Sequence, residues 1–263
     1  MYSAAMRRLA IVVMLLAGCG GSDKQCDGEV GHDEDGDGLD DGCDPCPYAD
    51  DNDLDEDGDG IAGVCDPDPV AINTVLEFTG FEGDEPDITV TGGTIEGDAF
   101  HVKGGSMAGA ALWGTNLDHV WVVAGISVDE IDPAGYREVG VVVDATTVAE
   151  TSLPNGTYCA VGESDVPIPG TDYIEVFTRQ QPAADETLAS DQAVLYLSGL
   201  KQAVIQASHV VGQTPSLSCA FGVPGNRAII AGTPTSSPVA GQVGVFGFAV
   251  DAKFSFLYIL GSP

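Results

Sequence analysis

The chain of 263 residues carries 41 acidic residues against 9 lysines and arginines, which gives a formal net charge of −32. This charge excludes nucleic acid as a partner, because binding to nucleic acid depends on basic side chains that neutralise phosphates. The same density of carboxylates favours divalent cations. Hydrophobic residues make up 44% of the chain, which is enough for a sizeable folded core.

The first 18 residues have the pattern of an export signal. They begin with the basic pair Arg7 and Arg8 and continue with an apolar run, 9–17, that is too short to span a bilayer as a stable helix. We therefore predict a signal peptide over residues 1–18.

Residues 16–19 read Leu-Ala-Gly-Cys and resemble the lipobox of bacterial lipoproteins. The resemblance implies cleavage before Cys19 and acylation of its thiol, so that 19–25 becomes a lipidated tether. Several acyl chains together hold a protein durably on a membrane. Glycine at position 20 implies, by the same resemblance, the outer membrane or the cell surface of a bacterium. The alternative is an ordinary signal peptide that leaves Cys19 without a lipid.

An acidic segment, 26–69, contains an internal repeat, because the pattern of residues 33–44 recurs at 55–66. Each copy reads Asp-Glu-Asp-Gly-Asp-Gly followed by an aliphatic residue, and each ends in Cys-Asp before a proline. The segment has few large apolar residues. It therefore needs metal ions or disulfides to fold.

Both copies have the ligand spacing of a calcium loop of about twelve residues, with acidic side chains at alternate positions, a glycine at the bend and a carbonyl after it. The first copy supplies Asp33, Asp35, Asp37, the carbonyl of Leu39, Asp41 and Asp44. The second copy supplies Asp55, Asp57, Asp59, the carbonyl of Ile61 and Asp66. We expect two Ca²⁺ sites, and the second is the weaker because Gly63 replaces its ninth-position carboxylate.

The flanks of the loops do not fit an EF-hand, because Pro45 and Pro67 prevent a helix from following. The Cys-Asp-Pro-Cys-Pro sequence at 43–47 and the Cys-Asp-Pro sequence at 65–67 instead resemble thrombospondin type 3 repeats over 26–69. This resemblance implies calcium ions wrapped by an irregular chain, with disulfides between successive repeats. Dockerin modules share a similar loop but need helices. An acidic linker without metal is the remaining alternative.

Apart from Cys19, the chain has six cysteines, an even set that is typical of disulfides in an exported protein. Several pairings are open. We prefer two pairs that follow the repeat and one pair in the C-terminal region, namely Cys26–Cys43, Cys46–Cys65 and Cys159–Cys219.

From residue 72 onwards, short β-rich runs alternate with glycine, proline and asparagine. We predict a succession of short strands between 74 and 260, among them 94–102 and 193–198, with a short helix at 183–193 as the one exception. The chain is therefore expected to be mainly β, with irregular disulfide-linked repeats followed by a two-sheet antiparallel sandwich over 70–263.

Several segments of 70–263 resemble laminin G-like and concanavalin A-like jelly rolls. They are Ala-Phe-His-Val at 99–102, His-Val-Trp-Val-Val at 119–123, Gly-Gln-Val-Gly-Val-Phe at 241–246 and the run 254–259. The resemblance implies a jelly roll, a fold that serves glycan binding, protein adhesion and glycoside hydrolysis. Aromatic candidates for a sugar platform are Trp113, Trp121 and Tyr136, although sandwich aromatics more often lie in the core.

The sequence contains no complete catalytic set. The Glu130-Ile131-Asp132 sequence resembles family 16 glycosidases, but Pro133 follows and the second glutamate is missing. We therefore expect a non-enzymatic, lipid-anchored, calcium-binding surface protein. In it, the repeats form a calcium-stiffened stalk, and the sandwich serves adhesion to a glycan or a surface protein. The alternative is a glycan hydrolase or lyase on the jelly-roll face.

Overall fold

The computed structural model describes thirteen segments of the chain, namely 32–41, 43–50, 55–82, 85–104, 108–117, 119–131, 136–146, 152–164, 171–193, 195–210, 216–223, 226–234 and 240–261. The predicted signal peptide, Cys19 and its tether lie outside these segments. The described part of the chain holds no helix long and apolar enough to cross a membrane.

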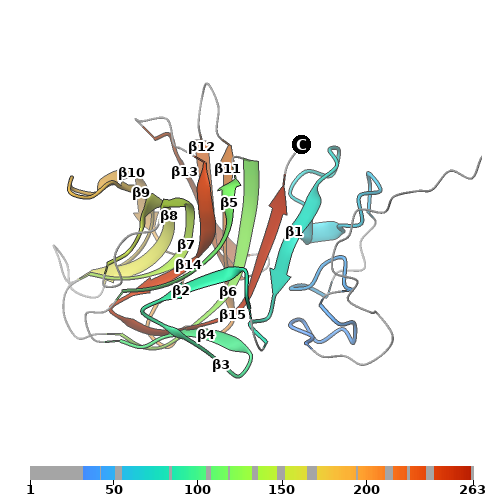
Figure 1. The fold of residues 1–263 in the computed structure, drawn as a ribbon, viewed down its shortest axis with the longest axis horizontal. Helices are drawn as coiled ribbons and strands as arrows, with labels where there is room; N and C mark the ends of the chain where they lie inside the picture. The colour runs from blue at the N-terminus through green and yellow to red at the C-terminus, as the bar shows by residue number, and fades with distance from the viewer. Residues whose placement is uncertain are drawn as a thin grey trace, which may run out of the picture.

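Two antiparallel sheets form a sandwich (Figure 1). The eight-stranded sheet contains, in spatial order, β13 (Asn226–Gly232), β12 (Ser216–Val223), β11 (Ala203–Val210), β6 (His119–Ile131), β15 (Val250–Gly261), β4 (Ala99–Val102) and β3 (Thr94–Glu96), with β1 (Thr74–Thr79) paired to β15. The seven-stranded sheet contains β10 (Glu186–Gln192), β9 (Thr171–Arg179), β8 (Asn155–Ser164), β7 (Tyr136–Thr146), β14 (Gly241–Phe248), β5 (Ala108–Leu117) and β2 (Ile88–Thr91). The predicted mainly β fold and its two-sheet antiparallel sandwich are confirmed.

Alternation along the strands builds the core, because successive side chains of a strand point to opposite faces. On β7, Val139, Val141 and Val143 are buried in the core between the sheets. The predicted disulfide Cys159–Cys219 joins β8 to β12 through this core, with its Cα atoms 5.3 Å apart. A loop of this length makes the cross-link worth about 4 kcal/mol in the chain-entropy model.

Some local predictions are wrong. The segment 183–193, where a helix was the expectation, contains β10, because pairing with β9 outweighs local helix propensity. The predicted strand at 193–198 is irregular where it is described, and its Leu197 N–H bonds the Asp172 carboxylate at 2.7 Å instead of a neighbouring strand. The predicted strand 94–102 is two strands, β3 and β4, which turn at Gly97 with a φ of 70°.

The acidic repeat region, which we define as residues 32–69, packs against the outer face of the eight-stranded sheet. Tyr48 stacks on Phe256 with ring centroids 5.6 Å apart and lies edge-on to Tyr258 at 6.2 Å. Ile61 is 1% exposed and belongs to the same buried cluster. The sequence prediction of a stalk that presents the sandwich did not include these contacts. A segment so poor in apolar residues obtains a core by covering an apolar sheet face.

The cysteines of the repeat region complete this cluster. Cys46 and Cys65 form the predicted disulfide, with Cα atoms 5.2 Å apart, and both are buried against the sheet. Cys43 is disulfide-bonded as well. Its predicted partner, Cys26, lies outside the described residues.

Replacement of Tyr48 by alanine tests whether this packing stabilises the protein. We expect Tyr48→Ala to lower the free energy of unfolding by about 3 kcal/mol, because a 7% exposed aromatic ring is lost from a packed cluster. Urea unfolding of the full chain measures this change. Tyr196→Ala is the matched control, since Tyr196 is 79% exposed and should cost less than about 0.5 kcal/mol. Equal effects of the two variants would show that the repeat region contributes no packing energy.

Candidate functional site

Two acidic loops lie in the repeat region, and each brings three carboxylates together. Candidate ligand oxygens of Asp33, Asp35 and Asp37 lie within 4.8 Å of one another. Asp55, Asp57 and Asp59 form an equivalent group in the second loop. Six aspartates from the predicted ligand sets are thus gathered as two triads.

Glycines allow the sharp path of each loop. In the first loop, Gly36 and Gly38 have φ values of 82° and 96°, a region that favours glycine. Their N–H groups donate to the two oxygens of Asp33 at 2.7 and 3.0 Å. In the second loop, Gly58 and Gly60 donate to Asp55 in the same way. The two copies of the sequence repeat therefore fold alike.

The predicted carbonyl ligands follow the triads directly. Leu39 donates its N–H to Asp37 at 2.7 Å, and Ile61 donates its N–H to Asp59 at 2.8 Å. These bonds place both residues at the closing end of their loops.

The electrostatics of the loops fit a cation. Burial, with the neighbouring charge of Asp44 next, raises the pKa of Asp35 to about 6. Asp66 has a raised pKa because of burial and then the charges of Asp59 and Asp57. Asp44 and Asp66 therefore lie close to the first and second triads. One buried oxygen of Asp35 and one of Asp57 accept no hydrogen bond. Clustered oxygen ligands of this kind suit Ca²⁺.

The ninth-position residues differ between the loops. Asp41 is 4% exposed, accepts the Glu34 N–H at 3.0 Å and pairs with the His32 ring. In the second loop, Asn73 approaches the site from just before β1. Its backbone N–H donates to Asp59 at 2.7 Å and its amide donates to Asp66 at 3.2 Å. The sequence pattern gave no signal for Asn73, because this residue lies outside the repeat.

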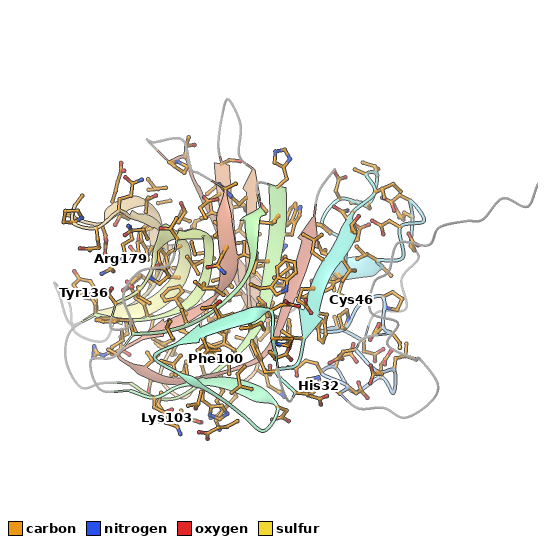
Figure 2. The ribbon with its side chains drawn as sticks, in the orientation of Figure 1. His32, Cys46, Phe100, Lys103, Tyr136 and Arg179 are labelled. Atoms are coloured by element: carbon orange, nitrogen blue, oxygen red, sulfur yellow. A yellow bond between two sulfur atoms is a disulfide. The ribbon has the colours of Figure 1, made fainter. Side chains whose placement is uncertain are left out.

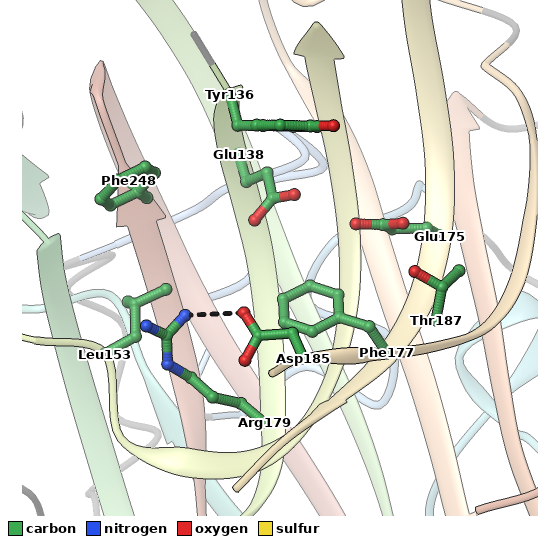
Figure 3. Close-up of a pocket in the computed structure, with 9 residues that line it drawn as sticks. All are labelled: Tyr136, Glu138, Leu153, Glu175, Phe177, Arg179, Asp185, Thr187 and Phe248. Atoms are coloured by element: carbon green, nitrogen blue, oxygen red, sulfur yellow. Dashed lines mark hydrogen bonds and ion pairs between the residues drawn. The ribbon is translucent and has the colours of Figure 1, made fainter. Parts of the chain in front are cut away.

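A pocket with a volume of about 410 Å³ opens on the other side of the sandwich, on the outer face of the seven-stranded sheet (Figure 3). Figure 2 shows Tyr136 and Arg179 at this end of the molecule, far from His32 and Cys46 in the repeat region. The lining residues come mainly from β7, β9 and β10. They are Tyr136, Glu138, Leu153, Glu175, Phe177, Arg179, Asp185, Thr187 and Phe248.

Two glutamates meet in this pocket. Glu138 on β7 and Glu175 on β9 flank β8, and the charge of each carboxyl group acts on the other. The β8 residues between them are small, since Glu138 lies opposite Gly162 and Glu175 lies opposite Ala160. A Cβ atom on Gly162 would lie 2.5 Å from the Tyr173 hydroxyl, so this glycine makes room for Tyr173.

The charged groups of the pocket form two sets, one that contains the glutamates and one that contains Arg179 and Asp185. The Tyr173 hydroxyl donates to Glu138 at 2.8 Å, and Arg179 pairs with Asp185 at 3.1 Å. Burial raises the pKa of Glu138. Burial, followed by the adjacent charge of Glu138, raises the pKa of Glu175 to about 8. The glutamate pair therefore retains a proton at neutral pH.

The predicted aromatic platform is dispersed. Tyr136 lines the pocket and is 56% exposed, whereas Trp113 packs against the core between the sheets and Trp121 packs beside the repeat region. The side chains of Glu130 and Asp132, from the glycosidase-like sequence, lie outside the described residues. The Glu138–Glu175 pair escaped sequence analysis because the pairing of β7, β8 and β9 was not known.

The sequence matches no protein-family model and no curated protein. Solved structures with a similar fold include the carbohydrate recognition domain of Emp47p, with a TM-score of 0.51 and 11% identity, covering 68% of this chain and 90% of that one. The potassium-bound carbohydrate recognition domain of Emp46p has a TM-score of 0.51 and 9% identity, covering 70% and 95% of the two chains.

A GH43 protein from Bacillus licheniformis, BlXynB, is also similar, with a TM-score of 0.50 and 12% identity. The match covers 70% of this chain but only 39% of that one. Together these similarities show a two-sheet jelly-roll fold and confirm the jelly roll that the sequence segments implied.

The raised pKa of Glu175 predicts a pH-dependent stability. The folded protein holds the proton up to about pH 8, whereas an unfolded glutamate loses it near the ordinary value of 4.5. The folded state therefore binds more protons in this window, so the free energy of unfolding should fall as pH rises through it.

The Glu175→Gln substitution removes this titration, so its stability should fall less steeply between about pH 5 and about pH 8. Urea unfolding at several pH values measures the slope. Glu186→Gln, at an exposed position of β10, is the control and should keep the slope of the unaltered chain. The prediction is wrong if Glu175→Gln also keeps it.

Proposed function

We propose that this protein binds carbohydrate in the Glu138–Glu175 pocket of its jelly-roll sandwich. The observation that carries the proposal is a pocket of about 410 Å³ with paired acid groups and aromatic walls, on an outer sheet face. Its volume lies within the range of small-molecule sites. The fold shared with two carbohydrate recognition domains supports a glycan as the ligand.

The sequence favours binding over hydrolysis. The glycosidase-like run at 130–132 lacks the second glutamate with which such enzymes complete their pair of carboxyl groups, and Pro133 follows it. A glycan hydrolase or lyase remains the alternative function, and release of reducing sugar from polysaccharides would support it.

A glycan array with the full chain tests the binding function. We expect a restricted set of glycans to bind. Tyr136→Ala should weaken this binding about fivefold, because a half-exposed ring at the pocket offers a stacking surface for a sugar. Tyr196→Ala removes an exposed ring outside the pocket lining and should leave binding unchanged. Binding that survives Tyr136→Ala intact, or an array without any bound glycan, would contradict the proposal.

We also propose that the two acidic loops bind Ca²⁺. Their triads, with Asp44 and Asp66, offer clustered oxygens that repel one another without a cation. Because the repeat region packs on the sheet, calcium would stabilise a cover over the sandwich. This placement replaces the free stalk of the sequence prediction.

Calorimetric titration of the full chain with Ca²⁺ measures these sites. We expect Asp35→Asn and Asp57→Asn each to weaken one site at least about tenfold, because each removes a charge from a triad. Asp98→Asn, at an exposed turn, should leave both sites intact. Absence of calcium binding at millimolar concentration would reject the metal sites and leave the carbohydrate proposal standing.

Lipid attachment at Cys19 is proposed from the sequence alone, together with a location in the bacterial outer membrane or at the cell surface. Expression of the full chain in bacteria with labelled palmitate tests it. We expect label and membrane association in the unaltered chain and loss of both in Cys19→Ser. A Cys19→Ser chain that stays in the membrane fraction would contradict the lipid anchor.

A further inference from the structure

We propose that the Glu138–Glu175 pocket selects glycans that carry a free ammonium group, such as those built from glucosamine. This inference rests on the proposed carbohydrate-binding function and specifies the chemical class of the ligand. It follows from the charge, the geometry and the aromatic lining of the pocket.

Among the described residues, the two glutamates of the pocket have no basic side chain in an ion pair with them. Glu138, Glu175 and Asp185 line the pocket, and Arg179 is the one basic residue among the lining residues that the structure describes. Arg179 pairs with Asp185 at 3.1 Å. The glutamate pair therefore offers a site for a cation supplied by a ligand.

The geometry directs both glutamates at the same point. Figure 3 shows the carboxyl groups of Glu138 and Glu175 directed toward each other across the pocket. Gly162 and Ala160 leave the strand between them free of large side chains. The Tyr173 hydroxyl holds Glu138 in place at 2.8 Å. An ammonium group has three donors, enough to bond both carboxylates at once.

The raised pKa of Glu175 leaves a proton on this carboxyl group at neutral pH. The groups that face the pair from the surrounding strands are Tyr136 on β7, Tyr173 and Arg179 on β9, and Asp185 and Thr187 at β10. The charge of Asp185 also favours a cation, and Arg179 opposes it. Binding of an ammonium sugar should displace the proton from Glu175, since two carboxylates then face the cation directly.

The remaining walls suit a sugar ring. Tyr136 is 56% exposed, while Phe177 and Phe248 supply further aromatic lining. Aromatic faces bind the apolar face of a sugar and attract a cation that lies over them. A bare metal ion fits less well, because calcium takes about six to eight oxygen ligands and the pocket supplies few. Among the described residues, the metal-type clusters lie in the acidic loops and not here.

Calorimetry with the full chain compares two probes that differ in charge, the β-1,4-linked tetramer of glucosamine and the tetramer of N-acetylglucosamine. We expect the glucosamine tetramer to bind at least about tenfold more tightly, since a charge-assisted hydrogen bond is worth about 1.5 kcal/mol or more. Titrations in mildly acidic buffers of different ionisation enthalpy, in which the amines of the tetramer already carry their protons, should detect proton release with the glucosamine tetramer alone.

Two variants test whether the glutamate pair is responsible. Glu138→Gln and Glu175→Gln keep the shape and hydrogen bonding of the side chain but remove the charge, and each should bring the affinity ratio close to one. Circular dichroism and thermal unfolding confirm that the variants remain folded. Glu186→Gln, outside the pocket lining, should keep the full ratio.

The possible outcomes distinguish the ammonium preference from the carbohydrate-binding function on which it rests. Equal affinities, a preference for the acetylated tetramer, or a preference that survives both glutamine substitutions would overturn the inference. If neutral glycans bind and their binding is lost in Tyr136→Ala, the carbohydrate function stands and the ammonium preference fails. If neither tetramer nor any glycan of the array binds, both proposals fail.

Discussion

Strand alternation is the constraint on which the whole structure depends. Each sheet has two faces, and the inner faces close on one core that includes the Cys159–Cys219 disulfide. The outer face of each sheet is then either packed against other residues or exposed to solvent and ligands. The acidic repeat region covers one of these faces through Tyr48 and Ile61, because these few apolar side chains find partners on the sheet. The acidic repeat region therefore obtains its buried core by packing on the apolar outer face of the eight-stranded sheet.

The outer face of the seven-stranded sheet combines a buried apolar cluster, which includes Val142, Tyr158 and Phe246, with the pocket that holds the two glutamates. Glutamates in a partly buried pocket cost free energy unless something compensates their charge. Here the raised pKa of Glu175, which leaves its carboxyl group uncharged at neutral pH, reduces this cost, while Arg179 compensates Asp185. This arrangement is stable without a ligand but leaves a position that a ligand cation can take. Acidic groups therefore appear on both sides of the sandwich, in loops suited to calcium and in a pocket suited to an organic cation.

The sequence predicted the features that depend on local pattern. Alternating apolar residues indicated the sandwich, and the spacing of Asp33, Asp35 and Asp37 indicated a loop that gathers carboxylates. Features that depend on strand order escaped prediction, because Glu138 and Glu175 meet only when β8 lies between β7 and β9. The contact of the repeat region with the sheet was missed for the same reason, since Tyr48 and Phe256 stand at opposite ends of the chain. The predicted helix at 183–193 failed because pairing with β9 decided that segment.

We propose that the two outer faces of the sandwich have separate functions, calcium binding on one and glycan binding on the other. Hydrogen–deuterium exchange of the full chain, with calcium and the glucosamine tetramer added separately, distinguishes the two faces. We expect calcium to slow exchange in residues 32–69 and the tetramer to slow exchange in β7, β9 and β10. Protection of the same segments by both ligands, or protection of the pocket strands by calcium alone, would show that the two functions are not separate.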